Sequence, residues 1–147
     1  MKKTLALIAL LPTIFVPTTL FAQDFSSQID MRQNAFEQIE SLSKQADKTL
    51  NGSNTDWQAL AQIGNELSRH SEHLQQAFPQ GSQADSKAKQ EVWSKPENFN
   101  RLMVQMDEGF VQLYQAAQDQ QVSAAEAGLK QAQSTCRSCH RAYRSRW

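Results

Sequence analysis

Hydrophobic residues recur every three or four positions along most of the chain, with polar residues between them. This spacing is typical of amphipathic helices that bury one face. Four such stripes can be followed, and their inward positions are Phe25, Ile29, Phe36, Ile39, Leu42, Ala46 and Leu50; Trp57, Leu60, Ala61, Gly64, Leu67, Ser71, Leu74 and Phe78; Phe99, Leu102, Met103, Met106, Phe110, Leu113 and Ala117; and Ala125, Leu129, Ala132, Cys136, Cys139, His140 and Tyr143. The pattern predicts an all-α protein.

Turn-forming residues separate the first two stripes. The segment 51–54, Asn-Gly-Ser-Asn, is suited to end one helix and to begin the next. The second helix is expected over residues 55–78, because Pro79 and Gly81 follow its last hydrophobic position. Residues 80–95 are polar and lack periodicity, so we expect a long crossover loop with room for one short helical turn.

The third and fourth helices also have recognisable starts. Pro96 suits the first turn of a helix. Ser123 and Glu126 have the spacing of a capping box at the start of the last helix. Two short connections and one long one favour an antiparallel four-helix bundle.

The first 22 residues have the pattern of a secretory signal peptide. Lys2 and Lys3 precede an apolar run over residues 5–16 that is too short to span a bilayer, and Ala22 precedes polar residues. We therefore expect residues 1–22 to be removed on export to the periplasm and residues 23–147 to form one domain. The mature chain then has 13 basic and 15 acidic residues. This balance favours neither nucleic acid nor a membrane as a partner.

Both cysteines of the chain lie in the segment Cys136-Arg137-Ser138-Cys139-His140. Two cysteines separated by two residues and followed directly by histidine are the attachment signature of c-type haem. On a helix these three positions share one face, so both thiols can add to haem vinyl groups while the imidazole reaches the iron. The segment predicts one haem c, bound covalently through Cys136 and Cys139, with His140 as the axial ligand of the iron.

A Cys-x-x-Cys pair can have three other functions. A zinc site needs four ligands, which His70 and His73 would have to complete, and this alternative stays open. A thiol redox centre is expected near a βαβ pattern, whereas this motif ends a helical stretch. A disulfide between the two cysteines would close too small a ring to constrain the unfolded chain much.

A four-helix chain with this motif in its last helix resembles the cytochrome c′ family. Three segments carry the resemblance: 31–36 (Met-Arg-Gln-Asn-Ala-Phe), 91–94 (Glu-Val-Trp-Ser) with Phe99 after it, and 136–144. The resemblance implies that the haem is contacted by Arg32 at a propionate, by Gln33 in the same segment, by Phe36 over the distal face of the iron, by Trp93, and by Arg144 near the proximal face. Lys87 is a further candidate for a propionate contact.

The residue opposite His140 decides the function. Phenylalanine cannot coordinate iron, so Phe36 favours five-coordinate, high-spin haem that binds nitric oxide or carbon monoxide. The alternative is a six-coordinate electron carrier. Its sixth ligand would be a histidine or a methionine, yet Met31 points away from the face of Arg32 and Phe36, and Met103 and Met106 lie in a core stripe.

Two further expectations concern activity and assembly. We expect that the protein is not an enzyme such as a peroxidase, because no acid or base lies near Phe36 to assist O–O cleavage. We expect a homodimer, since the resemblance implies one and Trp57, Leu60 and Leu67 offer apolar surface outside the haem site. The sequence does not identify the redox partner.

Overall fold

The computed structural model describes residues 24–146, so the predicted signal peptide lies outside the described residues. The helices are α1 (Ser26–Leu50), α2 (Trp57–Gln75), α3 (Glu91–Ser94), α4 (Pro96–Gln118) and α5 (Val122–Tyr143). Residues 24–146 contain no strand, and their only β-pairing is an isolated bridge between Ala88 and Arg144.

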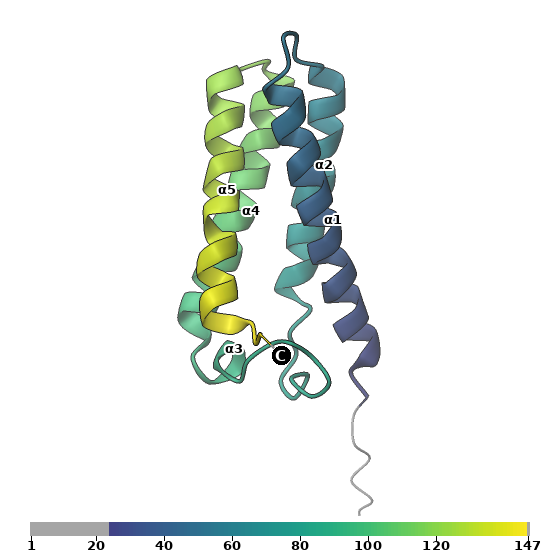
Figure 1. Ribbon diagram of the computed structural model, residues 1–147, viewed down its shortest axis with the longest axis vertical. Coiled ribbons are helices and arrows are strands. Elements are labelled where there is room, and N and C mark those ends of the chain that lie inside the picture. Colours follow the sequence, from purple (N-terminus) through teal and green to yellow (C-terminus); the bar gives the residue numbers. More distant parts are fainter. Residues whose placement is uncertain (1–23, 147) are drawn as a thin grey trace, which may run out of the picture.

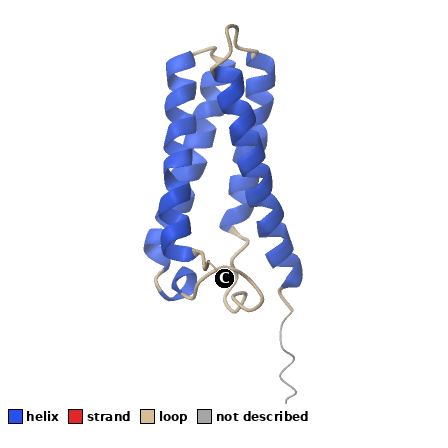
Figure 2. Ribbon diagram, in the orientation of Figure 1, coloured by secondary structure: helices blue, strands red, loops and turns tan. Residues whose placement is uncertain are grey.

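The four long helices run antiparallel in sequence order, and α3 lies at the end of the bundle where the chain terminates (Figure 1). Figure 2 shows that loops gather at this same end. The α4–α5, α2–α4 and α1–α2 sides are closely packed, whereas α1 and α5 make the fewest contacts of the four sides and draw apart toward the loop end. The predicted all-α four-helix bundle is confirmed, as is the short helical turn in the crossover loop.

Most buried positions follow the four predicted stripes, but the prediction that Cys136 and His140 lie inward is wrong, because both are exposed. The side chains that are almost wholly buried include Leu60, Leu67, Leu74, Phe110 and Leu113, which come from α2 and α4. Burying one such side chain contributes about 1.5–3 kcal/mol, so the inward stripes account for the assembly of the bundle.

The prediction that Trp57, Leu60 and Leu67 form an exposed apolar surface for a dimer is wrong. Leu60 and Leu67 have an exposed fraction of 0% within a single chain, because both point into the bundle core. Trp57 is half-buried and packs against the same core. These residues therefore offer no apolar patch to a second copy.

Three predicted helix boundaries also differ from the structure. The helix α2 begins after Asp56, whose carboxylate accepts a hydrogen bond from the backbone N–H of Ala59 at 3.0 Å, and it ends at Gln75 rather than at Phe78. The helix α5 begins at Val122 without a side-chain cap, so the predicted capping box is wrong. The preceding turn places Gln120 at φ +55°, and the helix starts two residues later at Val122.

The α4–α5 contact depends on two glycines at which the helix backbones touch. A Cβ atom on Gly109 would lie 2.6 Å from the nitrogen of Ala132 and 2.6 Å from the oxygen of Gly128. A Cβ atom on Gly128 would lie 2.7 Å from the oxygen of Gly109. Because backbone atoms on both helices would have to move, no rotamer change can relieve these contacts.

We therefore expect Gly109→Ala to lower the free energy of unfolding by about 1–3 kcal/mol through overpacking. Thermal unfolding of the variant beside the parent protein measures this change. Gly52→Ala is the matched control, because the nearest atom to its added Cβ is 3.5 Å away, and its expected effect is within about 0.5 kcal/mol. Equal unfolding temperatures for the parent and Gly109→Ala would contradict the proposed close contact.

Candidate haem-attachment site

The predicted attachment residues lie in the last two turns of α5. Cys136, Cys139 and His140 belong to one unbroken helix that ends at Tyr143, so they share a face as the motif requires. Cys136 and His140 are exposed, whereas Cys139 is half-buried and packs against the hydrophobic core. Both thiols are unpaired.

The surroundings of the thiols do not resemble a thiol redox centre. Desolvation raises the pKa of both cysteines, and the proximity of Cys136 adds to the rise for Cys139, whose pKa is about 11. Disulfide oxidoreductases instead lower the pKa of the attacking thiol so that thiolate forms near neutral pH. The thiol redox alternative is therefore disfavoured.

One stretch of α1 faces this end of α5. The negative charge of Glu40 interacts electrostatically with His140 and Arg144. Its carboxylate also accepts a hydrogen bond from the ammonium group of Lys44 at 2.6 Å. Burial lowers the pKa of His140, the charge of Arg144 lowers it further, and Glu40 opposes both effects. A neutral imidazole is the form that coordinates a metal.

Arg32 lies on α1 two turns before Glu40, and its side chain is buried with an exposed fraction of 3%. Its Nη1 donates to the carbonyl oxygen of Ala77 at 3.3 Å and to the hydroxyl of Ser82 at 2.9 Å. Its Nη2 donates to the carbonyl oxygen of Ser82 at 2.7 Å. Arg32 has no ion pair among residues 24–146, although a guanidinium remains charged in proteins. Its neutral partners leave that charge uncompensated, so the site suits a negatively charged group.

An aromatic cluster lies beside Arg32. The half-buried Phe36 meets Phe78 edge-to-face, with ring centroids 6.5 Å apart. Phe78 in turn lies 4.9 Å from Phe99 and 6.3 Å from Trp93, while the guanidinium carbon of Arg32 is 4.8 Å from the centroid of the Phe78 ring. Trp93 donates from Nε1 to the carbonyl oxygens of Phe78 and Pro79 at 3.1 and 2.9 Å.

The cluster reaches the attachment helix through Phe99, whose ring lies 5.3 Å from that of Tyr143. Phe78 is the central member, and the sequence predicted it as an inward position of the second helix but not as part of this site. The chain leaves α2 at Gln75, before Phe78 and Pro79, and the ring of Phe78 contacts Phe36 of α1. Phe36 and Trp93, two of the predicted site residues, thus both contact Phe78 in this cluster.

The remaining predicted site residues, Arg144, Gln33 and Lys87, lie outside the aromatic cluster. Arg144 is exposed at the end of α5 and acts electrostatically on His140. Gln33 is exposed on α1, and within residues 24–146 its side chain has no hydrogen bond. Lys87 is exposed, and its carbonyl oxygen accepts a hydrogen bond from the backbone N–H of Ser145 at 2.8 Å.

The methionines occupy the positions that the helical pattern predicted. Met31 has an exposed fraction of 42% and lies off the face that carries Arg32 and Phe36. Met103 and Met106 are buried in the core at 4%. This placement gives no support to methionine as a second ligand of the iron.

His70 and His73 lie on α2, where they line a small cavity with Glu66 and Arg69. Across residues 24–146 no three side chains of histidine, cysteine, aspartate or glutamate form a group that could hold a metal ion, so the two histidines do not join the cysteine pair. In the same range no helix is sufficiently long and apolar to cross a bilayer.

Comparisons with known proteins agree with this arrangement. A family model described as Cytochrome C′ matches residues 27–144. No curated protein sequence matches the chain significantly. Among solved structures, cytochrome c′ from Rubrivivax gelatinosus is 21% identical with a TM-score of 0.76, and the match covers 84% of this chain and 98% of that chain.

Two further structures share the fold. The nitric oxide complex of a leucine-to-alanine variant of cytochrome c prime from Alcaligenes xylosoxidans is 21% identical with a TM-score of 0.77, covering 86% of this chain and 100% of that chain. A cytochrome c′ described as having an unusual ligand-controlled dimer dissociation is 16% identical with a TM-score of 0.73, covering 86% of this chain and 100% of that chain.

Proposed function

The chain belongs to the cytochrome c′ family, and from this premise we propose that it is an exported haem c protein that binds nitric oxide or carbon monoxide at five-coordinate, high-spin iron and exchanges electrons with a redox partner. The proposal is supported by Phe36, which cannot coordinate iron and lies one turn before Glu40, the residue of α1 whose charge acts on His140. Family membership and the nitric oxide complex of a relative support the choice of ligand.

The residues present fit a haem group. Cys136 and Cys139 provide two thiols on one helical face, and His140 beside them has a lowered pKa, which favours the neutral imidazole that binds iron. The buried charge of Arg32 lacks a described anionic partner and suits a propionate. When bound, haem c would supply an iron that His140 could hold and that a small molecule could bind.

The aromatic cluster determines which ligands the protein can stabilise at that position. Phe36 and Phe78 present apolar rings that donate no hydrogen bond, so they do not stabilise the negative charge that bound dioxygen accumulates. Nitric oxide and carbon monoxide depend less on such a donor. Neither ring supplies a proton, so the function we propose is ligand binding rather than catalysis.

The visible absorption spectrum of the ferrous holoprotein tests the proposal. We expect bands of high-spin haem in the absence of ligand and conversion to a low-spin spectrum on addition of carbon monoxide. The reason is that Phe36 leaves the position opposite His140 open. Low-spin bands before any ligand is added would contradict the proposal and favour the six-coordinate electron carrier.

We also propose that the protein forms a homodimer, because it belongs to a family with a member described by its dimer dissociation. The interface cannot use Leu60 or Leu67, which are buried within each chain. Sedimentation velocity is expected to show a species of twice the monomer mass at micromolar concentration. A monomer alone at that concentration would count against the dimer and would leave the haem proposal unaffected.

A further inference from the structure

The outer side of α5 carries a line of positive charge. Lys130, Arg137 and Arg141 are all exposed and lie seven and four residues apart, which places them on one side of the helix. Arg144 and Arg146 follow, and both are exposed. No aspartate or glutamate occurs after Glu126, so this stretch contains no acid to neutralise them.

The crossover loop adds two lysines to the same place. Lys89 donates from its backbone N–H to the oxygen of Tyr143 at 2.9 Å, Ser145 donates to the oxygen of Lys87 at 2.8 Å, and Ala88 bridges to Arg144. The ammonium group of Lys89 also donates to the carbonyl oxygen of Arg141 at 3.2 Å. Because these bonds tie the loop to the end of α5, the cations of both segments form one surface.

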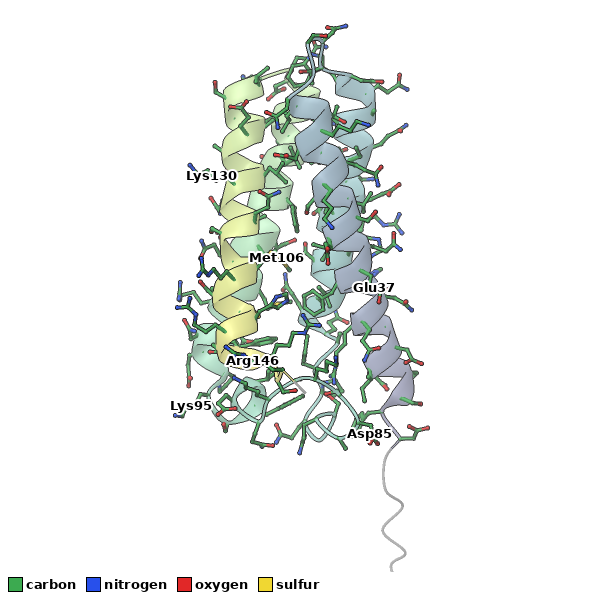
Figure 3. All side chains as sticks on the ribbon, in the orientation of Figure 1. Glu37, Asp85, Lys95, Met106, Lys130 and Arg146 are labelled. Atoms are coloured by element: carbon green, nitrogen blue, oxygen red, sulfur yellow. The ribbon has the colours of Figure 1, made fainter. Side chains whose placement is uncertain are left out.

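We call this surface the basic end and define it by Lys87, Lys89, Arg137, Arg141, Arg144 and Arg146. In Figure 3, Arg146 lies at the loop end of the bundle, as does Lys95, whereas Asp85 lies toward α1. The only ion pair among residues 24–146 joins Lys44 and Glu40 on α1, so no cation of the basic end has a carboxylate within salt-bridge distance. Glu40 does act on Arg144, and Asp85 and Glu91 flank the loop, but these three acids face six cations.

The near-zero net charge thus hides a separation of charge along the chain. Residues 24–84 contain 4 basic and 8 acidic residues, whereas residues 85–146 contain 9 basic and 7 acidic residues. Cations near a helix C-terminus stabilise the terminal carbonyls, which explains Arg141 and Arg144. That effect falls off within one turn, so it explains neither Arg137 nor Lys87.

We infer that the basic end docks an acidic electron-transfer protein. This inference rests on the proposed function, since it assigns a surface to the electron exchange proposed above. Arg137 and Arg141 directly follow Cys136 and His140, so a partner held by them lies next to the haem-bearing turns. Charge complementarity at such a surface accelerates encounter between partners.

An anionic membrane is the less favoured partner. A membrane-binding surface combines cations with apolar side chains that insert among the lipids. The exposed large hydrophobic residues among residues 24–146 are Met31, Val104 and Val122, and none belongs to the basic end.

The test is electron transfer to the ferric holoprotein from a strongly acidic probe, a reduced plant-type [2Fe–2S] ferredoxin, a direction favoured by the low reduction potential of such ferredoxins. The variant Arg141→Gln/Arg146→Gln removes two charges from the basic end. The matched control Lys48→Gln/Arg69→Gln removes two charges from α1 and α2. Rates are compared at an ionic strength of about 10 mM, where the Debye length is ~30 Å, and at about 1 M, where it is ~3 Å.

At low ionic strength we expect the second-order rate constant to fall about threefold to tenfold in the basic-end variant and by less than about 1.5-fold in the control, with both differences lost at high salt. Equal losses in both variants would overturn the inference, because net charge alone would then explain them. An unchanged rate combined with weaker binding of the basic-end variant to phosphatidylglycerol vesicles would also overturn it, in favour of a membrane. Carbon monoxide binding in all three proteins shows separately whether the haem site itself is as proposed.

Discussion

Acid–acetone treatment of the holoprotein is expected to leave all of the haem colour in the protein precipitate and none in the solvent. The reason is that thioether bonds to Cys136 and Cys139 would hold the haem even after acid protonates His140 and breaks its bond to the iron. A haem held by coordination and packing alone would dissolve in the acidified solvent. Absorbance of the two fractions measures the outcome.

Variants sharpen this prediction because they separate the covalent bonds from the iron ligand. In Cys136→Ala/Cys139→Ala we expect all of any bound haem to pass into the solvent. In His140→Ala we expect the haem to stay with the protein but its spectrum to change, since only the axial ligand is lost. Extraction of the colour from the unmodified protein would contradict covalent attachment.

The bundle was predictable from the sequence because its core repeats every three or four residues. Ile39, Leu60, Phe110 and Leu129 were assigned inward positions and are buried. Hydrophobic periodicity works here because each helix is long and has one buried face. Pro96 also marked the start of α4 correctly, since proline at the first helical position loses no intrahelical hydrogen bond.

Helix ends were less predictable because distant contacts decide them. Phe78 continues the stripe of α2 in spacing, but its ring leaves the helix to pack against Phe36 and Phe99. The carbonyl oxygens of Phe78 and Pro79 then accept hydrogen bonds from Trp93, which lies 15 and 14 residues away. A local pattern contains no information on these partners.

The candidate site shows the same division. The attachment motif is local and could be recognised from the positions of Cys136, Cys139 and His140 alone. The contacts of Arg32 could not be foreseen, because Ala77 and Ser82 lie 45 and 50 residues further along the chain. The pairing of the crossover loop with Arg144 escaped prediction for the same reason, although it positions the basic end.

Phe36→Ala is expected to accelerate carbon monoxide binding to the ferrous protein about tenfold. In the proposed arrangement the half-buried ring of Phe36, which contacts Phe78 edge-to-face, lies over the iron, so a ligand approaching the iron has to displace it. Displacing a packed side chain costs on the order of 1 kcal/mol or more. A barrier of about 1.4 kcal/mol corresponds to tenfold slower binding, and removing the ring removes that barrier.

Stopped-flow carbon monoxide binding measures the effect, and two variants act as its controls. Met31→Ala shortens another hydrophobic side chain of α1, but Met31 lies on a different face, so we expect no change in rate. Phe36→Met introduces a thioether that can coordinate iron, so we expect a shift toward the low-spin spectrum before ligand is added. These variants separate a change at the distal face from a general loosening of α1.

The size of the acceleration also depends on Phe78, because this second ring remains when Phe36 is removed. Phe78 is held by Phe99, by Trp93 and by the guanidinium of Arg32, so it is less free to move than Phe36. We therefore expect Phe36→Ala to open one side of the distal face and to leave the other closed. Equal carbon monoxide rates for the parent and Phe36→Ala would show that Phe36 does not gate the iron, and α1 would then have to be reassigned away from the distal face.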